Sequence, residues 1–243
     1  IYTNLICGHY LEYFFYLKNA GGKNMANERV ARRVNLIKKL EESQWCFADN
    51  NKVYISGRVT EQLEFSHRGK YEEFYKTKVK VTRFSGVPDY VPIVISSALL
   101  TPRMRSELAD KWLELFGEIR TYNSKDSKGK RHLDVYILVS TMTVADTEEE
   151  IEIPKGNILY LEGYVVKPPI YRKTPLGTEI ADLTIAINRN YGKTAYVPCI
   201  AWGRDARASQ EFEVGTYVCL YGRFQSREYF KRNTPTSNKG TYM

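Results

Sequence analysis

The sequence predicts an all-β protein built from two tandem small barrels, with one short helix near its amino terminus. Three observations lead to this prediction. The 243-residue chain resembles itself at an offset of 106 residues, apolar and polar residues alternate within each copy, and turn residues separate the alternating segments. The length allows two small domains, and 43% hydrophobic residues are enough to build their cores.

The repeat consists of short matches that keep their order and nearly constant spacing. The matching pairs are Asn51 and Asn157, Tyr54 and Tyr160, Gly57 and Gly163, Arg83 and Arg189, Tyr90-Val-Pro92 and Tyr196-Val-Pro198, and, at an offset of 105, Leu115-Phe-Gly117 and Leu220-Tyr-Gly222. Matches in constant order are rare by chance, so we infer an internal duplication.

Each copy contains segments with the period of two that is typical of half-buried β-strands. In the first copy Thr77, Val79 and Val81 alternate with lysines, and in the second Leu183, Ile185 and Ile187 alternate with small or polar residues. A helix-compatible stretch then follows in each copy, at residues 101–109 and 204–212. A fourth strand is expected at residues 112–122 and 216–227, and a fifth, at residues 133–144, in the first copy alone.

Three strands, a short helix and two more strands is the order of the OB-fold, a five-stranded Greek-key barrel. We therefore expect a first OB-fold at residues 49–145 and a second at residues 156–243. The acidic residues 146–155 are expected to form a solvated linker. The second copy reaches Met243 without an equivalent of the fifth strand. Its barrel is therefore expected to lack its last strand, as in a chain truncated at its carboxyl end.

The first 48 residues stand outside the repeat. Residues 25–48 are expected to hold a helix at 28–43, because Val30, Val34, Ile37 and Leu40 recur at helical spacing opposite basic residues. Residues 1–24 carry no capped or periodic pattern and precede Met25, so we interpret them as a non-native segment read through from upstream. A signal peptide is the competing interpretation, but a charged amino-terminal region and a small-residue cleavage site are missing.

Charge and cysteine content narrow the classes of function. Lys and Arg outnumber Asp and Glu 36 to 28, which gives a net charge of +8 and favours polyanionic partners. The four cysteines (Cys7, Cys46, Cys199 and Cys219) form no CxxC pair, which argues against a zinc site or a disulfide framework. Cys199 and Cys219 fall in apolar strand patterns and are expected to be buried, and a reduced, cytoplasmic setting follows.

No catalytic constellation emerges from the sequence. The three histidines, His9, His67 and His132, are scattered, and no nucleophile–base pair or carboxylate cluster lies beside any of them. We therefore predict a protein that is not an enzyme and that needs neither a cofactor nor a metal ion.

Aromatic and basic residues are interleaved in the second copy. Proteins that bind single strands without sequence preference combine a cationic track for the phosphates with aromatic faces on which bases stack. The candidate stacking residues are Tyr191, Tyr196, Trp202 and Tyr229. The candidate phosphate contacts are Arg189, Lys193, Arg204, Arg223 and Arg227.

Four motifs in residues 157–230 also carry a resemblance. They are Asn157-x-x-x-Leu-x-Gly163, Ala181-x-Leu-Thr-Ile-Ala-Ile-Asn188, Pro198-Cys-Ile-Ala-Trp-Gly-Arg-Asp-Ala206 and Gly215-x-x-Val-x-Leu-Tyr-Gly-Arg223. With them the segment resembles the DNA-binding domain of bacterial single-stranded DNA-binding proteins. The stacking positions of that family match the four aromatic residues named above, with Tyr in place of the usual Trp at several. The resemblance implies sequence-independent binding of single-stranded DNA during replication, recombination or repair, in the nucleoid of a bacterial cytoplasm.

The first copy fits this pattern less well. Ser96 stands in the place of Trp202 and Ser85 in that of Tyr191, although Phe84 and Tyr90 remain. The row formed by Lys76, Lys78 and Lys80 could neutralise phosphates, or it could be a solvated basic face. The first copy is therefore either a weaker, electrostatic binder of DNA or mainly a barrel for oligomerisation.

The resemblance also concerns partners. The family commonly presents four barrels to DNA, so a chain with two is expected to form a homodimer, and replication or recombination proteins are further candidate partners. Three other functions compete with DNA protection. They are an OB-fold nuclease, a primosomal or recombination accessory protein that acts through protein partners, and an RNA chaperone of the cold-shock type.

Overall fold

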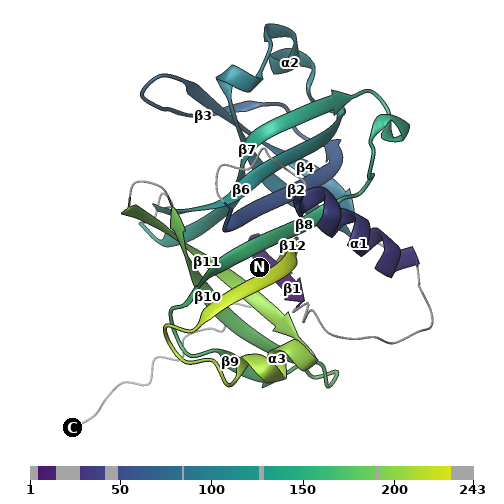
Figure 1. The fold of residues 1–243 in the computed structure, drawn as a ribbon. Coiled ribbons are helices and arrows are strands. Elements are labelled where there is room, and N and C mark those ends of the chain that lie inside the picture. Colours follow the sequence, from purple (N-terminus) through teal and green to yellow (C-terminus); the bar gives the residue numbers. More distant parts are fainter. Residues whose placement is uncertain are drawn as a thin grey trace.

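The computed structural model describes residues 5–14, 28–41, 49–83, 85–125, 129–189 and 192–230. Two β-barrels share one continuous twelve-stranded sheet (Figure 1). In that view the first barrel, in blue and teal, lies above the second, in green and yellow. The prediction of two tandem OB-type barrels is confirmed.

Barrel one is a closed five-stranded barrel with an added hairpin strand. Its strands are β2 (Asn51–Val59), β3 (Glu64–Arg68), β4 (Glu73–Thr82), β5 (Pro88–Ser96), β6 (Trp112–Lys125) and β7 (Arg131–Ala145). Strand β4 pairs with β5, β5 runs parallel to β7, β7 pairs with β6, and β6 pairs with β2. A short ladder between β2 and β4 closes the circle, and β3 pairs only with β4.

The burial of side chains in β4 alternates as the sequence predicted. Thr77, Val79 and Val81 point into the barrel and are buried, whereas Lys76 and Lys80 are exposed. Between β5 and β6 lie a short 3-10 helix, η1 (Ser97–Leu99), and helix α2 (Pro102–Glu107). The hydroxyl of Thr101 caps α2 by accepting a hydrogen bond from the backbone N–H of Met104 at 3.2 Å.

Glycine is required where each barrel closes. A Cβ on Gly57 would lie 2.3 Å from the carbonyl oxygen of Lys80, and one on Gly163 would lie 2.3 Å from that of Ala186. Both distances are far inside van der Waals contact, so only glycine lets the first strand of each copy cross its second strand this closely.

Barrel two repeats this arrangement but takes its fifth strand from the other end of the chain. Its own elements are β8 (Asn157–Val165), β9 (Ile170–Lys173), β10 (Glu179–Arg189), β11 (Lys193–Trp202), helix α3 (Arg204–Ser209) and β12 (Tyr217–Phe230). The fifth place belongs to β1 (Leu5–Phe14), which runs antiparallel to β12 and parallel to β11. This is the position that β7 occupies between β6 and β5 in barrel one.

Strand β1 corrects two expectations. As predicted, the described residues after β11 supply only a fourth strand, but barrel two is closed rather than open because β1 completes it. Residues 1–24 showed no capped or periodic pattern and were interpreted as read-through from upstream, yet Leu5–Phe14 is a ten-residue strand. The physical reason is the gap that β11 and β12 would leave between them without β1. Their unpaired edges would offer backbone hydrogen bonds to any strand that reaches them.

The two barrels are joined by direct pairing of their first strands. Strands β2 and β8 run antiparallel, with Val53 opposite Leu159 at the centre of the ladder. Matching hydrogen bonds flank it, because the Ser56 N–H donates to the Gly156 carbonyl at 2.9 Å and the Glu162 N–H donates to the Asn50 carbonyl at 2.8 Å. The repeat relates these two bonds to each other, so the barrels are arranged around an approximate two-fold axis.

Helix α1 (Glu28–Glu41) covers the outer face of this junction. Leu36 and Leu40 are buried against Tyr54 of β2 and Ile158 of β8, with Ile37 packed beside them. The helix was predicted, but its buried face is rotated from the expected one, because Val34 is exposed and Leu36 is buried. The linker is also less solvated than expected, since Ile151 is buried and the 3-10 helix η2 (Glu148–Glu150) precedes it.

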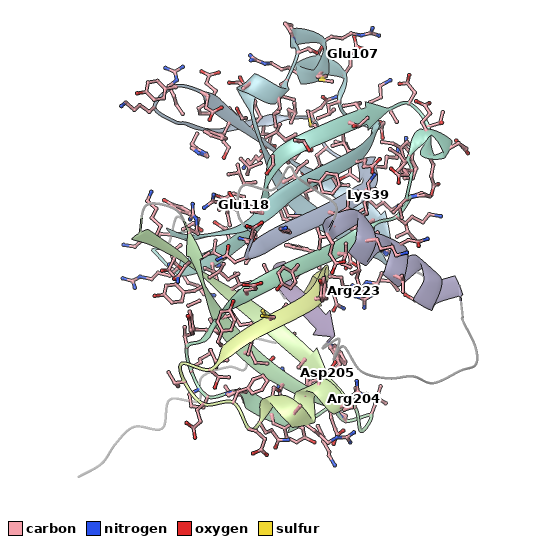
Figure 2. The ribbon with its side chains drawn as sticks, in the orientation of Figure 1. Lys39, Glu107, Glu118, Arg204, Asp205 and Arg223 are labelled. Carbon is pink, nitrogen blue, oxygen red and sulfur yellow. The ribbon has the colours of Figure 1, made fainter. Side chains whose placement is uncertain are left out.

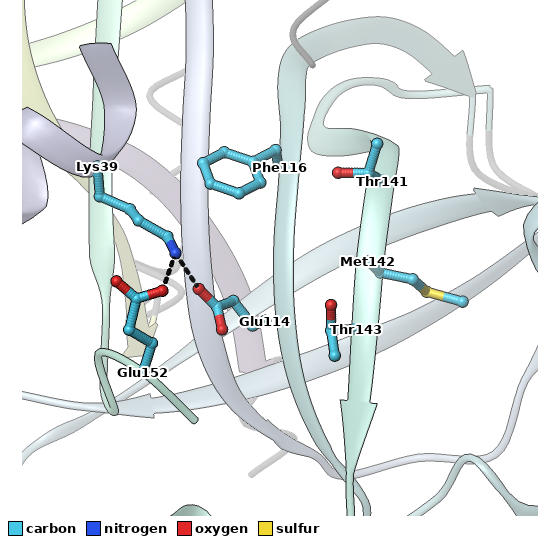
Figure 3. Close-up of a pocket in the computed structure, with 7 residues that line it drawn as sticks. All are labelled: Lys39, Glu114, Phe116, Thr141, Met142, Thr143 and Glu152. Atoms are coloured by element: carbon cyan, nitrogen blue, oxygen red, sulfur yellow. Dashed lines mark hydrogen bonds and ion pairs between the residues drawn. The ribbon is translucent and has the colours of Figure 1, made fainter. Parts of the chain in front are cut away.

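A hollow of about 450 Å³ lies beside α1 and is lined by residues of β6, β7 and the linker (Figure 3). The Lys39 ammonium reaches into it, 3.1 Å from the Glu114 carboxylate, and also pairs with Glu152. Burial opposes the charge of Lys39, but its bonds with Glu152 and Glu114 outweigh burial and raise the pKa of Lys39. The ion pairs of Lys39 with Glu114 of β6 and Glu152 of the linker therefore connect α1 and the linker to barrel one.

Candidate nucleic-acid interface

The outer face of strands β10 and β11 carries the aromatic residues that the sequence singled out. Ala195, Val197, Cys199 and Ala201 of β11 point into barrel two, which places the alternate residues on the other face of the strand, where only Ile200 among residues 196, 198, 200 and 202 is buried. Tyr196, with 51% of its surface exposed, and the half-buried Trp202 therefore lie on the same side of one strand. Six residues of extended strand separate them by about 20 Å. This spacing leaves room for several bases of a single strand between the two rings.

Cations lie at both ends of this aromatic face. Arg204 begins α3 directly after Trp202 and Gly203, and its side chain is 76% exposed. At the other end of β11 the exposed Lys193 is the cross-strand neighbour of Arg189. Tyr196, Trp202 and Arg204 thus follow one another along one side of β11. Lys193 and Arg189 lie at the Tyr196 end of the strand, but the alternation of β11 places them on the Ala195 side rather than on the Tyr196 side.

Other predicted residues lie elsewhere. Arg223 lies on β12, away from Arg204 and Asp205 of α3 (Figure 2). Arg227 and Tyr229 also belong to β12, where their backbones pair with β1, and their side chains lie outside the described residues. Tyr191 falls outside the described residues altogether. Arg223 is therefore not part of the aromatic face, because β12 stands on the opposite side of β8 from β10, and its contact with DNA stays a prediction.

Several arginines near the face are already neutralised. Arg172 of β9 makes a bidentate ion pair with Asp182 of β10, with N–O distances of 2.8 to 3.0 Å. Arg207 of α3 pairs with Glu179 at 2.7 Å. Pairs of this kind reduce the positive field at the rim. Arg204 itself lies 3.9 Å from the Asp205 carboxylate, whereas Lys193 has no ion pair among the described residues.

The corresponding face of barrel one is less aromatic and more nearly neutral. Lys76 pairs with Glu64 at 3.3 Å and Lys78 with Glu61 at 2.8 Å. Of the lysine row, Lys80 alone has no ion pair among the described residues. The row was expected either to neutralise phosphates or to form a solvated basic face. Two of its members have a glutamate partner in the structure, Glu64 of β3 for Lys76 and Glu61 just before β3 for Lys78.

The structure also reveals an aromatic cluster that sequence analysis missed. Phe65 of β3 is exposed and lies edge-on to Tyr75 of β4, with ring centroids 6.2 Å apart. Arg105 of α2 lies over the Tyr75 ring at 5.3 Å, and Lys70 lies over the exposed Tyr71 at 4.8 Å. The repeat concealed this cluster, since the equivalent hairpin of the second copy has a different sequence.

The two cysteines behave differently from each other. Cys199 is buried in barrel two, as predicted, and burial raises the pKa of its thiol. Cys219 is exposed on the outer face of β12, so the expectation of burial is wrong for it. Residues 217, 219, 221 and 223 of this strand are more exposed than the residues between them, and apolar neighbours in the sequence did not reveal that register.

The described part of the chain contains no group of three or more His, Cys, Asp and Glu side chains placed to hold a metal ion. A separate finding is that none of the described helices is long and apolar enough to cross a membrane.

Comparison with known proteins agrees with this geometry. Residues 157–241 match the sequence profile of the Single-strand binding protein family. Single-stranded DNA-binding protein B of Bacillus subtilis is 31% identical over 80 residues, which cover 30% of this chain and 71% of that protein. Single-stranded DNA-binding protein 2 of Listeria innocua is 30% identical over 80 residues, which cover 30% of this chain and 50% of that protein. The chain spans about half the length of most of these relatives.

A solved structure extends the likeness to both barrels. The wild-type single-stranded DNA binding protein from Thermus aquaticus superposes with a TM-score of 0.57 over 76% of this chain and 94% of that chain, at 20% sequence identity. At this identity the likeness concerns the fold alone. The profile match, the relative from Bacillus subtilis and the motifs of barrel two together give the identity: the chain belongs to the Single-strand binding protein family.

Proposed function

We propose that this protein binds and protects single-stranded DNA without sequence preference, chiefly through the outer face of β10 and β11. The observation that carries the proposal is the placement of Tyr196 and Trp202 on one side of β11, with Arg204 and Lys193 at its two ends. Relatives of barrel two are named as single-stranded DNA-binding proteins, which supports the same assignment.

The mechanism follows from the chemistry of these groups. Bases stack on the exposed rings, and each stacked base contributes about 1–3 kcal/mol whatever its identity, because every base has a π-face. Lysine and arginine contact the phosphates and release counterions, so affinity falls steeply as salt is added. A duplex hides its base faces, so it cannot use the rings in this way.

The two barrels have unequal roles in this proposal. Barrel two is the principal binder. Barrel one contributes weaker contacts through Lys80 and the aromatic cluster around Phe65 and Tyr75, since most of its lysine row is paired with glutamate. Because the barrels are tethered, a weak second site still adds to overall affinity.

Fluorescence titration with oligo-dT, oligo-U and a duplex of equal length tests the proposal. Oligo-dT is expected to bind tightly and to quench tryptophan emission. A plot of log affinity against log salt should fall with a slope of about −0.7 for each phosphate contacted. Equal or tighter binding of the duplex contradicts the proposal, and preference for oligo-U redirects it to RNA.

The protein acts as a non-enzymatic binder in this proposal, in the bacterial cytoplasm and at the nucleoid. Replication or recombination proteins are its candidate protein partners. A homodimer, which presents four barrels, remains a prediction based on the preference of oligomers for closed two-fold symmetry. Light scattering of the DNA-free protein tests it, because a strictly monomeric mass at micromolar concentration excludes the dimer.

A further inference from the structure

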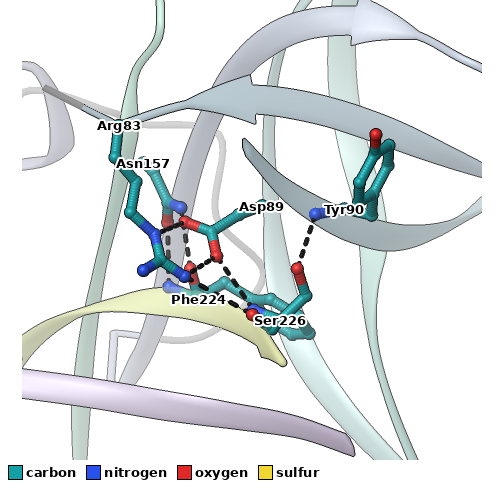
Figure 4. A network of polar contacts seen from close by, with 6 residues as sticks. All are labelled: Arg83, Asp89, Tyr90, Asn157, Phe224 and Ser226. Atoms are coloured by element: carbon teal, nitrogen blue, oxygen red, sulfur yellow. Dashed lines mark hydrogen bonds and ion pairs between the residues drawn. The ribbon is translucent and has the colours of Figure 1, made fainter. Parts of the chain in front are cut away.

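A buried ionic contact locks barrel one to barrel two on one side of the junction (Figure 4). The Arg83 guanidinium donates two hydrogen bonds to the Asp89 carboxylate, one of them from Nε at 2.7 Å. Asp89 is fully buried, and it also accepts a hydrogen bond from the backbone N–H of Ser226 at 2.9 Å. The Tyr90 N–H in turn donates to the Ser226 hydroxyl at 2.9 Å. The β4–β5 hairpin is thereby fastened to β12.

The same hairpin exists in barrel two with one charge removed. The offset of 106 residues carries Arg83 onto Arg189 and Asp89 onto Ala195. Gly86 and Gly192 stand at corresponding places between them, with φ angles of 82° and 67°. Strand β11 contacts β6 as β5 contacts β12, so both hairpins meet the other barrel. Barrel two therefore keeps the arginine of the ionic contact without its carboxylate.

Arg189 consequently has unused hydrogen-bonding capacity. Its Nε is buried and has no hydrogen-bond partner, and among the described residues no carboxylate pairs with it. Ala195, in the place of the missing acid, is fully buried and offers only a methyl group. A buried guanidinium nitrogen without an acceptor is unfavourable by itself, and it is stabilised when an anion arrives.

The positive charge of Lys193 makes binding of an anion beside Arg189 still more favourable. Lys193 is the cross-strand partner of Arg189, and like charges directly opposite each other in a sheet are destabilising. Tyr196 lies three residues further along β11, at the near end of the aromatic surface but on the opposite face of the strand from Lys193. A single strand that stacks on Tyr196 and turns around this end of β11 toward the other barrel would bring its phosphates to this pair of cations.

We propose that Arg189 and Lys193 form a phosphate subsite at the junction of the two barrels, and that barrel one has no equivalent because Asp89 fills the same place. The subsite rests on the proposed function, since its ligand is a backbone phosphate of the bound single strand. It makes the junction asymmetric. DNA passes between the barrels on the Arg189 side, and the Arg83–Asp89 side serves only to hold the barrels together.

Restoring the missing acid tests the subsite. Ala195→Asp recreates in barrel two the pair that Arg83 and Asp89 form in barrel one, and Ala195→Asn is its neutral control of equal size. For Ala195→Asp we expect oligo-dT to bind about tenfold more weakly near 0.1 M salt, because one charged contact is lost. The slope of log affinity against log salt should become shallower by about 0.7, the value for one phosphate. Ala195→Asn should keep the wild-type slope.

Two further measurements keep the result interpretable. Circular dichroism melting shows whether Ala195→Asp folds. If it does not, Arg189→Gln replaces it and should produce the same change of slope. A wild-type slope in a folded Ala195→Asp or Arg189→Gln variant overturns the subsite, and so does an equal loss in Ala195→Asn. Failure of the wild-type protein to bind oligo-dT is a different outcome, because it overturns the proposed function instead.

Discussion

Val53 and Leu159 face each other at the centre of the β2–β8 ladder, and the repeat offset of 106 residues carries one onto the other. The pairs on either side are related in the same way, since Asn51 faces Leu161 and Ile55 faces Asn157. The two copies thus pair as two subunits of a symmetric dimer do. Their covalent connection makes that pairing intramolecular and raises the effective concentration of each copy for the other.

Substitution of the aromatic face should reduce binding without affecting the fold. Tyr196→Ala and Trp202→Ala are each expected to weaken oligo-dT binding by about 1–3 kcal/mol, because each removes one stacking surface. Quenching of tryptophan emission should also be largely lost in Trp202→Ala. Fluorescence and anisotropy titrations measure both effects.

Tyr217 provides a matched control for this experiment. It is 53% exposed, close to the 51% of Tyr196, but lies on the outer face of β12 beside Tyr164. Tyr217→Ala should therefore bind oligo-dT like the wild type. If Tyr217→Ala and Tyr196→Ala lose the same affinity, the binding face has been assigned to the wrong side of barrel two.

In each barrel an asparagine side chain makes two hydrogen bonds to the backbone of a neighbouring strand. We call this pair of bonds an asparagine clip and expect it to contribute measurably to the free energy of unfolding. The Asn51 amide donates to the Ile119 carbonyl at 2.9 Å and accepts from the Ile119 N–H at 2.8 Å. Asn157 makes the same two bonds with Phe224, both at 2.8 Å. Asn51→Ala leaves buried backbone groups without partners, so we expect the free energy of unfolding to fall by about 2–3 kcal/mol.

Urea denaturation measures this change, with Asn123→Ala as the control. Asn123 is exposed near the end of β6, and its loss should alter stability by no more than about 0.5 kcal/mol. Equal effects of Asn51→Ala and Asn123→Ala would show that the clip contributes nothing beyond an ordinary surface contact.

Deletion of residues 5–14 should destabilise barrel two selectively. Strand β1 pairs with both β11 and β12, so its removal exposes two strand edges and invites aggregation. We expect faster amide hydrogen exchange in β11 and β12, with protection retained in β6 and β7 of barrel one. Unchanged exchange in β11 and β12 would mean that barrel two does not depend on β1.

The stability of the protein should depend on pH through Glu118. Burial raises the pKa of this carboxyl group, although the neighbouring Arg120 partly offsets the effect. The folded state therefore holds the proton of Glu118 more tightly than the unfolded state does. Its contribution is most favourable below the unfolded-state pKa and declines as pH rises through the folded-state pKa.

Comparison with Glu118→Gln isolates this contribution. The difference in unfolding free energy, wild type minus variant, should decrease as pH rises above about 4, the ordinary range of a glutamate pKa. Urea denaturation at several pH values measures it. A difference that is constant or that rises over this range contradicts the assignment.

Local pattern was enough to predict the two barrels and the centre of the candidate site. Alternation with a period of two is a property of each strand alone, so the pattern of residues 76–81 was sufficient to assign Thr77, Val79 and Val81 to the core of barrel one. The same reasoning applies to Tyr196 and Trp202, because their even spacing on β11 places them on one face.

What the sequence by itself determined was the duplication, the order of strands within each copy, and the residues that carry stacking and charge. Only the tertiary structure decided that β1 completes barrel two, that Lys76 and Lys78 are paired with glutamates, and that Arg189 lacks the carboxylate that Arg83 has. The physical reason is the range of the interactions. Side-chain alternation and turn residues act between neighbours in the chain, whereas strand pairing and ion pairs join residues that only the folded backbone brings together.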